Sequence, residues 1–61
     1  MVRSQKELIN SSLQNITEAY TRLTAVQELL KEAGLYNFSS AFSRIKDDIS
    51  IQAKDLTDLN K

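Results

Sequence analysis

The decad KEAGLYNFSS, residues 31–40, holds the only glycine of a 61-residue chain that contains no proline. If a helix ends at Ala33, Gly34 takes the next position, where the backbone is most often left-handed, a conformation that glycine adopts without a side-chain penalty. Leu35 then stands where a hydrophobic residue packs back on the last helical turn. Asn37 is a suitable N-cap for a second helix. The decad therefore predicts a helix stop, a turn over residues 34–36 and a helix start.

The segments on the two sides of this turn carry the same apolar repeat. Before the turn, a spacing that alternates between four and three residues runs through Ile9, Leu13, Ile16, Tyr20, Leu23, Gln27 and Leu30. After the turn, the same spacing runs through Phe38, Phe42, Ile45, Ile49, Gln52, Leu56 and Leu59. Such a repeat is typical of helices that pack almost parallel or antiparallel to a partner helix. Near the start, Ser4 and Glu7 have the spacing of a capping box. We expect helices over residues 4–33 and 37–59.

A connection of about three residues forces two helices into an antiparallel hairpin. The predicted fold is therefore all-α, a single helical-hairpin domain over residues 1–61. Each half of the repeat has one polar break, and polar residues at seam positions tend to fix the register of paired helices. With the turn near residue 35, Gln27 is expected near Ile45, and Gln52 near Tyr20.

The hairpin is too small to hold itself together easily, because a chain of this size buries only about 60% of its unfolded surface. It has no cysteine for disulfides, so oligomerisation is the remaining route to stability. Apolar residues beside the first seam supply a second stripe, and we expect two hairpins to form a homodimeric four-helix bundle. The residues expected at a dimer or partner interface are Ala19, Val26, Leu29, Ala33, Tyr36 and Ile51. The pattern leaves open whether a second copy or a larger protein covers this stripe.

The composition argues against enzymatic activity. The chain has neither histidine nor cysteine, which removes the usual neutral-pH base, the thiol nucleophile and the commonest transition-metal ligands. A two-helix hairpin also offers no deep cleft in which a substrate or cofactor is normally held. The acidic residues of the second helix alternate with basic ones, as on a solvated helix face. We therefore expect no catalytic residue, no cofactor and no metal site.

Charge and hydropathy give no sign of a nucleic-acid or membrane partner. Eight basic residues balance eight acidic ones, and the basic residues, Arg3, Lys6, Arg22, Lys31, Arg44, Lys46, Lys54 and Lys61, are dispersed along the chain. This distribution makes a poor track for phosphates. The longest apolar runs are pairs, and no signal-peptide core follows the start methionine, so a cytoplasmic location is expected.

These features predict a small non-enzymatic interaction module, a regulator, inhibitor or adaptor that docks an apolar helical face on a larger protein. Two alternatives stay open. In length and expected topology the chain resembles the Rop family of plasmid copy-number regulators, dimers of short helical hairpins that clamp paired RNA loops. That resemblance implies an RNA-binding dimer, for which Arg22, Lys31 and Arg44 are the first residues to replace. The other alternative is a small ligand bound inside the bundle, at a layer of Tyr20, Gln27 and Gln52.

Overall fold

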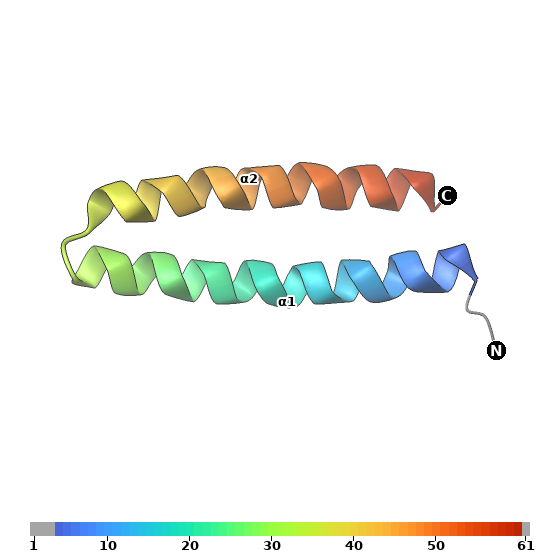
Figure 1. Ribbon diagram of the computed structural model, residues 1–61, viewed down its shortest axis with the longest axis horizontal. Coiled ribbons are helices and arrows are strands. Elements are labelled where there is room, and N and C mark those ends of the chain that lie inside the picture. The colour runs from blue at the N-terminus through green and yellow to red at the C-terminus, as the bar shows by residue number, and fades with distance from the viewer. Residues whose placement is uncertain (1–3, 61) are drawn as a thin grey trace.

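A computed structural model describes residues 4–60, which form two helices, α1 (Gln5–Glu32) and α2 (Tyr36–Leu59). The helices pack side by side in opposite directions, with the turn at one end and both termini at the other (Figure 1). The predicted all-α antiparallel hairpin is thus confirmed.

Helix α1 begins and ends where local sequence signals place its ends. Ser4 is the N-cap, with extended backbone angles, and its Oγ accepts a hydrogen bond from the Glu7 amide at 3.2 Å. At the other end Gly34 has a φ of 78°, in the left-handed region. The Gly34 amide donates to the Lys31 carbonyl at 3.0 Å, and the Leu35 amide donates to the Leu30 carbonyl at 2.8 Å. This pair of bonds is the Schellman motif, which satisfies two carbonyls that the helix end would leave unpaired.

Helix α2 starts one residue earlier than predicted, and Asn37 is not its N-cap. The cap is Leu35, whose side chain makes no capping bond, while its carbonyl accepts from the Ser39 amide at 3.2 Å. The Schellman motif already fixes Leu35, so the first turn of α2 closes directly on it. Asn37 therefore lies inside that turn, and the connection between the helices is shorter than the predicted 34–36.

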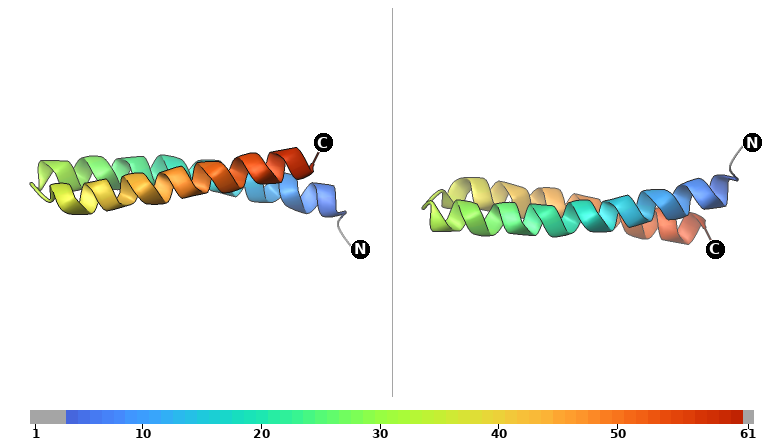
Figure 2. Two further views of the ribbon diagram at one scale, coloured as in Figure 1. Left: turned by 90° about the horizontal axis from the view of Figure 1, so that it is seen from above. Right: turned by 90° about the horizontal axis from the view of Figure 1, so that it is seen from below.

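The hairpin is a single layer of two helices. Its Cα atoms extend over 48 × 21 × 12 Å, and the edge-on views of Figure 2 show the helices crossing at a shallow angle with nothing above or below them. Ile9, at 9% exposure, is the only buried hydrophobic residue among those described. Domains usually bury a core between at least two layers, so both broad faces of this layer remain uncovered.

The two helices meet along the predicted seam of α1 but along a different line of α2. On α1 the seam residues are buried or half-buried except Tyr20, which is 37% exposed. On α2 the buried and half-buried residues are Ser39, Phe42, Lys46, Ile49, Ala53, Leu56 and Asn60. The predicted positions Phe38, Ile45, Gln52 and Leu59 are exposed instead. Helix α2 is thus turned about its axis by roughly half the width of its apolar stripe.

Candidate interaction surface

A buried glutamine explains why α2 is turned. Gln27, at 7% exposure, donates from Nε2 to the Ser39 carbonyl at 2.9 Å and to the Ser43 Oγ at 2.7 Å. Its Oε1 accepts from the Lys46 Nζ at 2.8 Å, and the Ser39 Oγ donates to the Gln27 carbonyl at 3.3 Å. A buried amide must find partners or incur a desolvation cost. These bonds draw the polar side of α2 onto the seam, so the expected contact of Gln27 with Ile45 is wrong.

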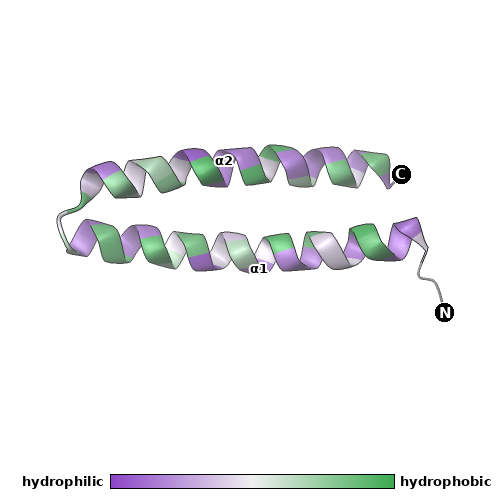
Figure 3. Cartoon of the chain, in the orientation of Figure 1, coloured by the Kyte–Doolittle hydropathy of each residue, from purple (hydrophilic) through white to green (hydrophobic). Residues whose placement is uncertain are grey.

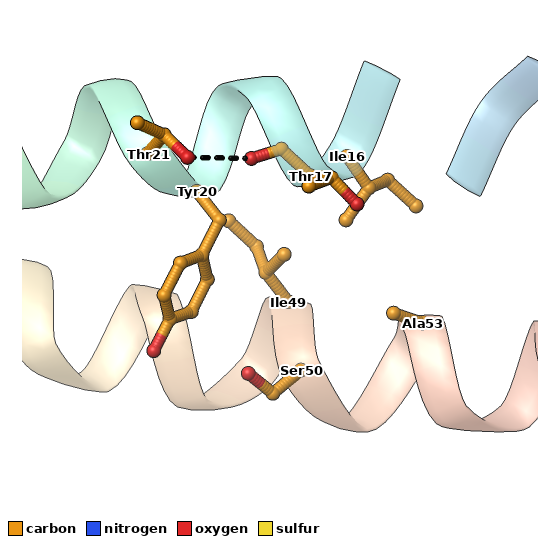
Figure 4. A pocket seen from close by; sticks show the side chains of 7 residues that line it. All are labelled: Ile16, Thr17, Tyr20, Thr21, Ile49, Ser50 and Ala53. Carbon is orange, nitrogen blue, oxygen red and sulfur yellow. Dashed lines mark hydrogen bonds between the residues drawn. The ribbon is translucent and has the colours of Figure 1, made fainter. Parts of the chain in front are cut away.

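The same side of the hairpin carries a second polar contact. The Lys46 Nζ lies over the Tyr20 ring, 4.7 Å from its centre, which is within cation–π range. Beyond it is a shallow hollow between the helices, lined by Ile16, Thr17, Tyr20, Thr21, Ile49, Ser50 and Ala53. Figure 4 shows the Tyr20 ring reaching from α1 toward α2 and the Thr21 hydroxyl bonded to the Thr17 carbonyl. We call this side, with Gln27, Lys46 and Tyr20, the polar face.

The opposite side of the hairpin is apolar. Its groove is lined mainly by apolar atoms, and the residues around it are Ile16, Ile45, Asp48, Ile49 and Gln52. Because Ile16 and Ile49 line both hollows, they mark the centre of the seam. Gln52 therefore lies on the side opposite to Tyr20, and the predicted layer of Tyr20, Gln27 and Gln52 does not converge on one site.

Helix geometry shows which other residues lie on this side. At about 100° per residue, Ala19, Val26 and Ala33 lie about 60° to 100° from Ile16 in the direction opposite to Thr17. On α2 the same rule places further residues beside Ile45 and Gln52. Together these positions form what we call the apolar face: Ala19, Val26, Leu30 and Ala33 of α1, with Phe38, Ala41, Ile45, Gln52 and Leu59 of α2. Figure 3 shows apolar residues recurring along both helices from the turn to the ends.

The residues predicted for an interface are not all on one surface. Ala19, Val26 and Ala33 lie on the apolar face. Leu29, 64% exposed, is turned further out on α1, by about 140° from Ile16. Tyr36, the first residue of α2, is 65% exposed beside the turn. Ile51 is 56% exposed and points away from α1, since it is two residues, or about 200°, from Ile49.

The sequence interpretation missed the α2 half of the apolar face, because Phe38, Ile45 and Leu59 were assigned to the seam within the hairpin. One signal for them exists in the sequence. With Gln52, these residues recur at every seventh position, as do Ser39, Lys46, Ala53 and Asn60 one position later. The second series is the more polar, yet it is the one that contacts α1.

The described residues offer no site for a metal, and they lack a membrane span. Among residues 4–60, no three or more carboxylates lie close enough together to hold a metal ion. Neither of the two described helices combines the length and the apolar character needed to cross a bilayer. Of the basic residues considered for RNA binding, Arg3 and Lys61 lie outside the described part of the chain.

Comparisons with protein-family models, curated proteins and solved structures find no match to this chain.

Proposed function

We propose that the protein is a non-enzymatic interaction module, a small regulator or adaptor that forms a homodimeric four-helix bundle and docks an apolar helical surface on a larger protein. The observation that carries this proposal is the imbalance of its hydrophobic residues. Among residues 4–60, nine large hydrophobic side chains are exposed, whereas Ile9 alone is buried.

Energetics support a module that works in contact with other chains. Burying one large apolar side chain fully contributes about 1.5–3 kcal/mol. The isolated hairpin gains this from few of its residues, and the balance of apolar burial against chain entropy in a chain this small is near zero. Covering the exposed residues with protein is therefore the main stabilisation still available to it.

Two separate apolar surfaces fit the two parts of the proposal. The apolar face runs along the hairpin and suits another layer of helices. The second surface, which we call the turn-end cluster, consists of Leu29, Leu35 and Tyr36, which are 64%, 46% and 65% exposed. It lies at the tip of the hairpin, beyond the reach of a layer that covers the apolar face. Tyrosine is enriched among the residues that dominate binding energy at interfaces, and the turn-end cluster is the surface proposed for the larger protein.

The proposal has two tests. Sedimentation equilibrium at micromolar concentration should give twice the chain mass of 6.9 kDa. For the larger partner, immobilised wild-type chain should retain a protein from the cells that produce it. Tyr36→Ala and Leu29→Asp should each weaken that binding by about thirtyfold, since losing an aromatic anchor or burying a carboxylate costs about 2 kcal/mol.

The control for added charge is Ser40→Asp, which places a carboxylate at an exposed position of α2 near the turn. It should leave partner binding within about twofold, as surface substitutions usually do. A monomer at high micromolar concentration would refute the dimer. A partner that binds the Tyr36→Ala and Leu29→Asp variants as tightly as the wild type would refute the role of the turn-end cluster.

A further inference from the structure

The structure points to one specific arrangement of the dimer, and the inference rests on the proposed homodimer. We infer that the apolar face is covered by the apolar face of a second copy, with both turns at the same end of the bundle. Helix α1 of each chain then lies against α2 of the other. The occupant of the face is thus another molecule of this chain.

The exposed area is of the size that such a pairing requires. The chain exposes 5040 Å², whereas a folded monomer of its 6.9 kDa mass is expected to expose about 4,000 Å². The excess is about 1,000 Å² per chain, or about 2,000 Å² for two chains, which is where the interfaces of obligate homodimers begin. A second layer of helices would also supply the missing half of a two-layer core.

The register of the hairpin fixes which residues would face each other. Asn60 donates from Nδ2 to the Asn10 Oδ1 at 2.8 Å, and Gln27 bonds to Ser43 at the same register. Residues of α1 and α2 whose numbers add up to about 70 therefore lie at the same height along the hairpin, since both helices rise equally per residue. A two-fold axis parallel to the helices keeps these heights, so the same rule holds between the copies.

Under this rule the apolar face is complementary to itself. From the turn toward the open end, the facing pairs between α1 of one copy and α2 of the other are Ala33 with Phe38, Leu30 with Ala41, Val26 with Ile45, and Ala19 with Gln52. In the first two pairs a small residue faces a large one, which lets the helices interlock at close distance. The apolar pairs gather toward the turn, and the polar ones toward the open end.

Charge distinguishes this arrangement from its main competitor. Arg22 and Asp48 are exposed beside the apolar face at the same height, so each would face the opposite charge on the other copy. If the turns instead lay at opposite ends, α2 would lie against α2 of the second copy. Pairing Phe38 with Leu59 would then bring the two copies of Asp48 together at the two-fold axis. Like charges placed face to face disfavour that association.

Cysteine crosslinking tests the arrangement directly, because the natural chain has no cysteine. In the variant Val26→Cys/Ile45→Cys, oxidation should give a covalent dimer in high yield. Within one chain the two positions lie on different helices of a layer whose axes are about 8–10 Å apart, beyond the reach of a disulfide. The competing variant Ile45→Cys/Gln52→Cys, whose positions face each other only when the turns are at opposite ends, should remain largely uncrosslinked.

Charge variants give a second readout that needs no crosslink. Asp48→Asn should weaken the dimer by about fivefold, as expected for the loss of a rim ion pair, and Arg22→Asp by more. The double variant Arg22→Asp/Asp48→Arg should restore most of the affinity. With the turns at opposite ends, Asp48→Asn would tighten the dimer instead.

The outcomes separate this inference from the proposed function. A monomeric wild type would refute the dimer and the inference together. A dimer that crosslinks through Ile45→Cys/Gln52→Cys, that is tightened by Asp48→Asn, or that crosslinks through neither cysteine pair would overturn the inference alone. Efficient crosslinking of Val26→Cys/Ile45→Cys together with rescue by the charge swap would support it.

Discussion

The hydrogen bond between Gln27 and Lys46 gives a quantitative test of what holds the two helices in register. Its 2.8 Å length and the 7% exposure of Gln27 place it inside the seam, while Lys46 is half-buried and keeps access to water. A bond to a charged group contributes about 1.5–3 kcal/mol when buried, and partial exposure reduces this to about 1 kcal/mol. That value is the expected coupling between the two side chains.

A double-mutant cycle measures it. Gln27→Leu removes three hydrogen bonds worth about 1 kcal/mol each, and the added apolar burial offsets part of that loss, so we expect a net destabilisation of about 1–2 kcal/mol. Lys46→Met keeps the packing of the stem but loses the bond to Gln27 and the contact with the Tyr20 ring, at a cost of about 1–2 kcal/mol. The double variant should be less destabilised than the sum of the two, by about 1 kcal/mol.

Urea unfolding followed by circular dichroism gives the four free energies of unfolding, provided that protein concentration is held fixed, since a dimer gains stability with concentration. Lys54→Met is the matched control, because Lys54 is exposed and its cycle with Gln27 should be additive within about 0.3–0.5 kcal/mol. Additivity of the Gln27 and Lys46 substitutions within the same limit would refute the view that this bond couples the helices.

Three further predictions concern the helix ends and nucleic acid. Gly34→Ala should lower the free energy of unfolding by about 1 kcal/mol because φ is 78°, whereas D-alanine at this position should not destabilise the chain; urea titration of synthetic chains compares them. Ser4→Ala should cost about 1 kcal/mol through the lost cap to the Glu7 amide, measured in the same way, and a change below 0.3 kcal/mol would show that the cap contributes little. Fluorescence anisotropy with a structured RNA should show no tight, salt-sensitive binding, because the chain is neutral and would release few counterions. Tight binding that weakens steeply with salt and is lost in Arg22→Ala would instead favour an RNA-binding dimer.

The parts of the fold that depend on neighbouring residues were predictable from the sequence. Ser4 caps the helix that follows it, and Gly34 ends that helix, through bonds that span only three to five residues. The four-three repeat predicted two long helices, and a connection this short leaves them no other direction than antiparallel. The start of α2 was displaced by one residue because Leu35 serves both the end of one helix and the cap of the next.

The face that α2 presents to α1 was not predictable in the same way. The local repeat gives the width of an apolar stripe, but it does not give the direction in which the stripe points. That direction depends on Gln27, whose partners Ser39, Ser43 and Lys46 lie 12 to 19 residues away. Residue type alone would rank Phe38 and Ile45 as better seam residues than Ser39 and Lys46. The need of one buried amide for partners outweighed that ranking.

The turned α2 also bears on assembly. In a bundle of four helices, an apolar stripe with four-three spacing points toward the centre of the bundle, between the two neighbours of the helix, and not directly at one of them. On α2 one edge of the stripe, at Phe42, Ile49 and Leu56, contacts α1. The other edge, at Phe38, Ile45 and Leu59, remains 60%, 44% and 64% exposed. This is the geometry expected of a helix with one neighbour in place and one missing. The same rotation that departs from the predicted seam therefore favours a second hairpin against the apolar face, and the cysteine pair at positions 26 and 45 tests whether it is there.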